Sequence, residues 1–169
     1  MSRRTPLLVL GLGNVLLQDD GLGVAAVSGL IDRFDPSEGV RVLDGGTLGL
    51  ALLPYFEDAD RVILVDAIRA SGAPGTFVRL SGDAVPPAVA SRLSPHQVGV
   101  ADLLDGARWL ERYPSCVRLL GLVPESLELG VDLSPPVQRA LPQLIERVAG
   151  EAGALGFPFV RKGRRPCTN

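Results

Sequence analysis

Apolar and polar positions alternate along this chain in blocks that predict a repeating order of strands and helices. Short runs rich in valine, isoleucine and leucine are typical of strands buried on both faces, and they occupy residues 7–12, 40–43, 61–65 and 117–123. Between these runs, apolar residues recur with a helical period at 21–34, 48–57, 97–112 and 135–152. Strands that alternate with helices favour a parallel sheet with helices on both faces.

Three further segments complete the predicted architecture. Residues 75–80 are typical of one more short strand, so the expected fold class is α/β, with three layers and a mostly parallel twisted sheet of about five strands. Residues 81–94 contain two adjacent prolines and no clear period, which predicts a long loop. The end of the chain is basic. We therefore expect a single α/β domain over 1–157 and a frayed basic tail over 158–169.

Composition narrows the possible classes of protein. The 169 residues, of which 46% are hydrophobic and 21% charged, suit one core. A formal net charge of -2 removes the broad basic surface on which non-specific nucleic-acid binding depends, so we expect neither DNA nor RNA as a partner. The first apolar run reaches Gly11 within a few residues, too soon for a signal sequence or a membrane span. We therefore expect a cytoplasmic protein without membrane insertion.

A glycine-rich turn between the first predicted strand and helix, at residues 11–23, carries the first candidate chemistry. A dinucleotide-binding turn would place glycine at position 16, where this chain has Leu16, and no G-K-[ST] follows for a phosphate-binding loop. Instead the turn carries Asp19 and Asp20, which would repel a phosphate. Two interpretations are open: one of these aspartates caps the following helix, or the pair favours a cation.

Acidic residues recur where the predicted strands end. Asp20 follows the first strand, Asp44 closes the second and Asp66 closes the third. Ligands of open parallel sheets collect beyond the carboxyl ends of the strands, and acids gathered there would repel one another without a cation. The alternative for Asp44 is a turn-forming role before two glycines, and for Asp66 a structural role.

The sole histidine, His96, adds a nitrogen donor to this set. It follows Ser94 and Pro95 and precedes Gln97, a sequence typical of a helix start in which serine and glutamine form a capping box. The amino end of a helix disfavours imidazolium, so we expect a neutral ring able to bind a metal. Asp20, Asp66 and His96 together predict an open transition-metal site with nitrogen and oxygen ligands.

Taken in order, these residues resemble the hydrogenase maturation proteases, and the resemblance covers nearly the whole chain. Members of that family begin with a strand and a pattern like G-x-G-N-x-L-x-x-D-[DE]-x-x-G. The matching segments here are Gly11 to Gly23, Asp44 to Thr47, Val65 to Ala67, Pro74 to Thr76, Ser94 to Gln97 and Val123 to Ser126. Several members carry glutamate where this chain has Asp20.

The resemblance implies a function and a set of site residues. It implies an endopeptidase that removes a short C-terminal peptide from the nickel-loaded precursor of a nickel-iron hydrogenase large subunit. Asp20, Asp66 and His96 would be both the metal-contacting and the catalytic residues, and Asp44 would orient a water or touch the substrate. The nickel would be the one held by the precursor, although another divalent metal bound by the enzyme itself, activating a water, fits the same residues.

Other hypotheses remain open at this level. A nucleophilic dyad of Cys116 with His96 requires the fold to bring the two together, whereas a buried thiol is the expected state of Cys116. The two cysteines, Cys116 and Cys167, are too far apart for a C-x-x-C metal site, so both should be free thiols. A non-catalytic nickel sensor or precursor-holding chaperone is the alternative function. We expect a monomer.

Overall fold

The computed structural model describes residues 4–90 and 96–163, with the backbone but not the side chain of His96. Five strands form one sheet in the order β3-β1-β4-β6-β5. Its strands are β1 (Thr5–Leu12), β3 (Val40–Gly46), β4 (Ala59–Ala67), β5 (Phe77–Ser81) and β6 (Cys116–Leu122). All neighbouring strands are parallel except β5, which is antiparallel to β6. The predicted sheet of about five mostly parallel strands is confirmed.

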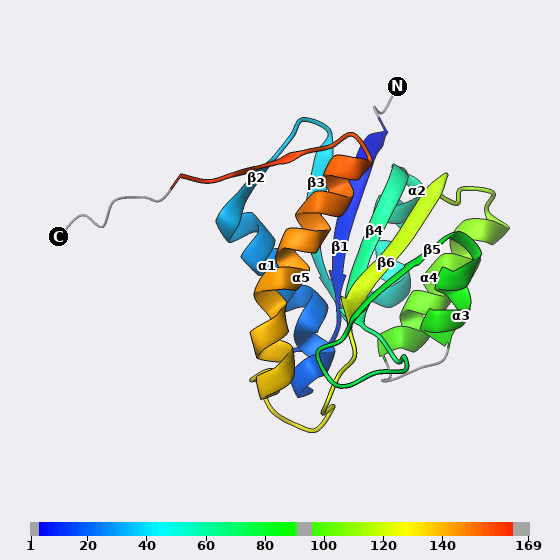
Figure 1. Cartoon of the computed structure of the whole chain (residues 1–169). Helices are drawn as coiled ribbons and strands as arrows, with labels where there is room; N and C mark the ends of the chain where they lie inside the picture. The colour runs from blue at the N-terminus through cyan, green and yellow to red at the C-terminus, as the bar shows by residue number, and fades with distance from the viewer. Residues whose placement is uncertain (1–3, 91–95, 164–169) are drawn as a thin grey trace.

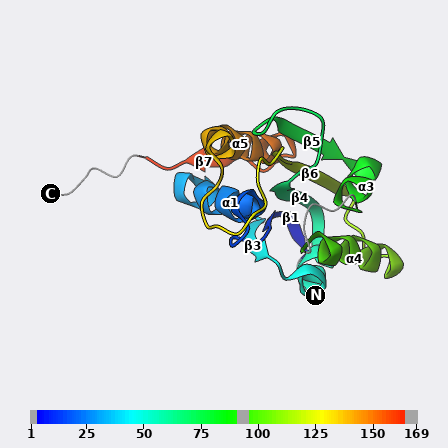
Figure 2. The same cartoon turned by 90° about the horizontal axis from the view of Figure 1, so that it is seen from below.

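Helices cover both faces of this sheet (Figure 1). One face carries α1 (Leu22–Arg33) and α5 (Pro135–Ala154), and the other carries α2 (Leu53–Glu57), α3 (Val85–Ala90) and α4 (His96–Trp109). The view along the strands in Figure 2 separates these layers. Two apolar cores result, one on each face, because the central strands β1, β4 and β6 bury both sets of alternating side chains. Among the described residues, no helix is long and apolar enough to cross a membrane.

Two predicted segments differ from the structure. The predicted helix at 48–57 is a 3-10 turn, η2 (Gly49–Leu52), followed by α2. The predicted loop at 81–94 contains the end of β5, the turn η3 (Gly82–Ala84) and then α3, while residues 91–94 lie outside the described part. Pro86 and Pro87 fall in the first turn of α3, where a helix needs no backbone donor, so they do not prevent it.

A second, two-stranded sheet ties the end of the described chain to α1. Strands β2 (Phe34–Pro36) and β7 (Phe159–Arg161) pair in antiparallel fashion. The Phe34 and Phe159 rings pack edge to face with centroids 6.4 Å apart, and the Lys162 amide donates to the Arg33 carbonyl over 2.8 Å. Residues 159–161 are therefore paired, which corrects for them the expectation of a frayed tail from residue 158.

Glycines of the first turn allow α1 to begin directly against the strands. A Cβ on Gly11 would lie 2.3 Å from the Gly23 carbonyl oxygen, and a Cβ on Gly23 would lie 2.0 Å from the Val65 carbonyl oxygen. Both positions therefore require glycine for close packing of helix on sheet. The same contact places the start of α1 beside the end of β4, one residue before Asp66.

Candidate functional site

Asp20 lies at the side of the sheet where the parallel strands have their carboxyl ends, which we call the carboxyl edge. It belongs to the 3-10 turn η1 (Gln18–Gly21) between β1 and α1. Its side chain is buried, with 0% of the residue exposed. Oδ2 accepts a hydrogen bond from the Asn14 amide over 3.0 Å. The turn depends on Gly13, whose φ is 128° and whose missing Cβ would meet the Asp20 carbonyl oxygen at 1.7 Å. Sequence and local backbone geometry together hold this carboxylate in one place.

Asp66 lies at the same edge, at the end of β4, and is equally buried, at 2% exposure. Its Oδ1 accepts a hydrogen bond from the Ala67 amide over 2.8 Å. Its Oδ2 accepts one from Gln97 Nε2 over 3.2 Å, and the same nitrogen donates to the Ala67 carbonyl. Amide donors favour the ionised form of a carboxyl group and fix its orientation.

Gln97 is a site residue that the sequence pattern did not identify as such. The sequence assigned it to a capping box with Ser94, which lies outside the described residues. In the structure, Gln97 is buried and its amide joins α4 to the end of β4. The first turns of α4 also approach η2 closely, because Gly49 and Gly99 face each other: a Cβ on either would lie 2.9 Å from the Cα of the other.

This anchoring determines where His96 stands. His96 is the first residue of α4, immediately before Gln97, so its backbone lies at the carboxyl edge close to Asp66. Its side chain is outside the described part, and the three-residue geometry predicted for Asp20, Asp66 and His96 stays a prediction. Among the side chains that the structure does describe, no three of the His, Cys, Asp or Glu type are grouped to hold a metal ion.

Asp44 stands apart from this group. Gly11 pairs with Asp44 of β3 on one side and with Val65 of β4 on the other, so the side chain of Asp44 shares a face with Val65 and not with Asp66. Asp44 is exposed, and its Oδ1 accepts a hydrogen bond from the Gly46 amide over 2.9 Å. This is the turn-forming role that the sequence offered as the alternative for Asp44.

Asp19 has a different role from its neighbour Asp20. It is fully buried and accepts hydrogen bonds from the loop between β6 and α5. Oδ2 accepts from the amides of Glu125 and Ser126 and from the Ser134 hydroxyl, at 2.8, 3.1 and 2.7 Å, and Oδ1 accepts from the Ser134 amide at 2.7 Å. Asp19 is therefore a tie between two loops, and no side-chain cap bond is formed at the start of η1 or of α1.

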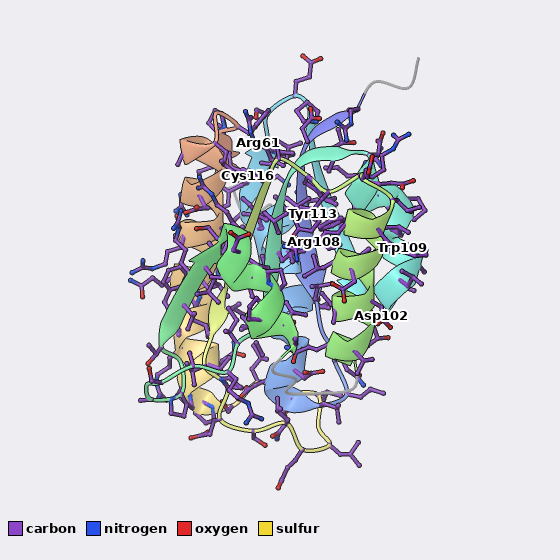
Figure 3. The ribbon with its side chains drawn as sticks, turned by 90° about the vertical axis from the view of Figure 1, so that its right-hand side faces the viewer. Arg61, Asp102, Arg108, Trp109, Tyr113 and Cys116 are labelled. Atoms are coloured by element: carbon purple, nitrogen blue, oxygen red, sulfur yellow. The ribbon has the colours of Figure 1, made fainter. Side chains whose placement is uncertain are left out.

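Cys116 lies at the opposite end of the strands from Asp66. It begins β6 and pairs with Arg61, whereas Asp66 pairs with Gly121 five residues further along. At a rise of roughly 3.3 Å per residue, about 16 Å separate the Cys116 position from the row of Asp66. Figure 3 shows Cys116 and Arg61 together at the edge remote from the loops of the site. Because α4 begins beside Asp66, this separation excludes a Cys116 and His96 dyad.

Comparisons with known proteins agree with this arrangement. The profile of the family described as hydrogenase maturation protease matches residues 24–151. The hydrogenase 2 maturation protease of Escherichia coli is 38% identical over 156 residues, which cover 90% of this chain and 95% of that protein. The structure of the E. coli hydrogenase maturating endopeptidase HybD superposes with a TM-score of 0.88 at 36% identity, over 93% of this chain and 98% of that one.

A more distant solved structure has the same fold. The [NiFe] hydrogenase maturation protease HybD of Thermococcus kodakarensis is 29% identical and superposes with a TM-score of 0.69, over 87% of this chain and 99% of that one. The profile match spans more than half of the chain, and the E. coli relative is matched along nearly its whole length. The chain is therefore a member of the hydrogenase maturation protease family and an endopeptidase.

Proposed function

We propose that this endopeptidase removes a short C-terminal peptide from the nickel-loaded precursor of a nickel-iron hydrogenase large subunit, in the cytoplasm. The observation that carries the proposal is the pair of buried carboxylates, Asp20 and Asp66, at the carboxyl edge where His96 opens α4. Two buried acids held by amide donors are costly unless a cation or a reaction uses them. The family is one of proteases, so a non-catalytic sensor or chaperone is not favoured.

The donor set fits a nickel ion carried by the substrate. Carboxylate oxygens and imidazole nitrogen are ligands that divalent first-row metals accept. The hydrogen bonds to Asp20 from Asn14 and to Asp66 from Ala67 and Gln97 come from N–H groups, which stabilise charged carboxylates. A carboxylate oxygen has two lone pairs, so an N–H partner does not prevent it from binding a metal.

In this mechanism the site residues first position the precursor. Asp20, Asp66 and His96 bind the nickel that the precursor carries, and this places one peptide bond of the precursor at the carboxyl edge of the sheet. The metal supplies Lewis-acid polarisation close to that bond. Gln97 keeps Asp66 in one orientation, which preserves the geometry that positioning requires. A precursor without nickel lacks this anchor, so it is not cut.

The test is mass spectrometry of the precursor after incubation with the protein, using nickel-loaded and nickel-free precursor. With the wild-type protein, we expect the nickel-loaded precursor to lose a C-terminal peptide and the nickel-free precursor to stay intact. With His96→Ala or Asp66→Asn, we expect both forms of the precursor to stay intact. The matched control is Asp102→Asn, which removes an exposed carboxylate from the same helix, α4 (Figure 3), and should leave processing unchanged.

Each result bears on a different part of the proposal. Unchanged processing by His96→Ala would remove the metal-contacting role of that residue. Cleavage of both precursor forms by the wild-type protein would contradict the dependence of cleavage on the precursor's nickel. If cleavage is then restored by adding metal to an enzyme from which metal had been removed, a metal bound by the enzyme itself is favoured. No mass change with any precursor would contradict the proteolytic step for this substrate.

A further inference from the structure

Exposed apolar side chains gather on the two loops that meet beside Asp20. Leu16 is 57% exposed, Leu129 is 85% exposed and Val131 is 74% exposed. The Gln18 amide donates to the Gly130 carbonyl over 2.9 Å, and the Gly130 amide donates to the Leu16 carbonyl over 3.0 Å. The bridge of Leu17 with Gly130 is parallel, so Leu16 stands opposite Leu129. We call Leu16, Leu129 and Val131 the apolar patch.

The backbone under the apolar patch is firmly held. The four hydrogen bonds of the Asp19 carboxylate fasten both ends of the loop between β6 and α5 to η1, at residues 125–126 and 134. A Cβ on Gly130 would lie 2.9 Å from Cγ of Gln18, so the loops are in close contact at their centre as well. Figure 2 looks onto this edge and shows the yellow loop crossing the start of α1. A loop whose backbone is already held loses little backbone conformational freedom when a partner binds.

The exposed charges on the loop between β6 and α5 are all of one sign. Glu125, Glu128 and Asp132 lie on the same loop and are exposed. Leu129 and Val131, separated by Gly130, lie between Glu128 and Asp132 along the chain, which makes an apolar surface with an acidic rim. Such a surface is complementary to an apolar segment that carries basic residues. The same loop is tied to the turn that holds Asp20, so the patch lies beside the carboxyl edge of the sheet.

From these observations we propose that the apolar patch is the docking surface for the hydrogenase precursor, which it contacts through an apolar segment with basic residues next to the cleaved bond. This inference rests on the proposed function, since it assumes that a precursor is the protein that approaches Asp20. It adds a recognition step that depends on the protein surface of the precursor and not on its nickel.

The experiment measures binding and processing separately. The variant Leu129→Ser with Val131→Ser removes the most exposed part of the patch. Trp109→Ser is the matched control, because Trp109 is 92% exposed at the far end of α4 (Figure 3). Binding of purified precursor is followed by biolayer interferometry, and processing by mass spectrometry over a range of precursor concentrations. We expect the patch variant to weaken binding by about tenfold or more and to raise KM with kcat little changed, while the control matches the natural chain.

A second variant, Glu128→Lys with Asp132→Lys, tests the rim. It should slow association, and the difference from the natural chain should shrink as salt is added. Binding and KM unchanged by both variants would overturn the docking surface. So would a fall in mass from dimer to monomer on serine substitution, which would show that a second copy of this chain covers the patch. If the natural chain binds the precursor without cutting it, the proposed function fails while the binding comparison still decides this inference.

Discussion

Asp19→Asn tests whether the buried carboxylate between the two loops is a main source of their rigidity. The replacement keeps the size of the side chain but removes its charge and turns one oxygen into a donor. In the best orientation the amide oxygen replaces Oδ2, which accepts three hydrogen bonds, and the NH2 group then faces the Ser134 amide. The hydrogen bond from the Ser134 amide is lost, because two N–H donors then face each other. The other three hydrogen bonds change from charge-assisted to neutral.

The cost follows from these contacts. A buried donor without an acceptor costs roughly 1–3 kcal/mol, and hydrogen bonds to a charged group exceed neutral ones by roughly 0.5–1 kcal/mol each. Some of this is offset because the neutral amide is cheaper to bury. We expect a net loss of about 2–4 kcal/mol in the free energy of unfolding, a large share of the total for a domain of this size.

The assay is urea denaturation followed by far-UV circular dichroism, with Asp102→Asn as the exposed control, for which a change within about 0.5 kcal/mol is expected. The midpoint should fall for Asp19→Asn while the slope with denaturant stays the same. A loss below about 1 kcal/mol would refute the reasoning, because it would mean that the four contacts of Asp19 are replaced without strain.

Two further predictions concern the sheet. Burial alone would raise the pKa of Glu151, but hydrogen bonds and charges from Arg79 and Arg118 outweigh it and lower the pKa below its usual value of 4.5. A carboxyl whose pKa is lower in the folded than in the unfolded state stabilises the protein at pH values above the unfolded pKa. Thermal melts at pH 7 should therefore show Glu151→Gln to be less stable than the wild-type protein by roughly 1 kcal/mol. The two stabilities should converge as the pH falls below 4.5. Gly23→Ala places a Cβ 2.0 Å from a backbone oxygen of β4 and should destabilise the protein by more than about 3 kcal/mol in the same melts. Gly150→Ala, whose Cβ meets nothing within 4 Å, should stabilise it by up to about 1 kcal/mol. Equal effects of the two variants would contradict the packing account.

Elements with a strong apolar pattern were predictable, and short or proline-containing ones were not. The buried runs of β1, β4 and β6 and the long helix α5 are visible in sequence because one periodicity is maintained over many residues. Strands β2 and β7 have three residues each, too few for a pattern, and they form because the end of the chain returns to α1. Helix α3 was hidden by its prolines, which read as loop residues until their place in the first turn is known.

The same distinction applies to the candidate site. Asp20 and Asp66 stood out in sequence because each follows an apolar run and therefore a strand end, and the structure buries both at the carboxyl edge. Asp44 stood out for the same reason, yet it is exposed and turned to the other face. Position along the chain predicts the edge of a sheet, whereas the face follows from strand pairing, which a single strand does not encode.

By itself, then, the sequence determined the α/β architecture, the family and the strand-end acids, because periodicity, glycine spacing and motif order are local properties of the chain. Only the tertiary structure decided which groups surround those acids. Asp19 is bonded to residues more than a hundred positions away, and Gln97 reaches Asp66 across 31 positions. Such partners are selected by the packing of loops and helices against the finished sheet. Hydrogen bonds need atoms within about 3 Å, and only the folded chain brings them that close.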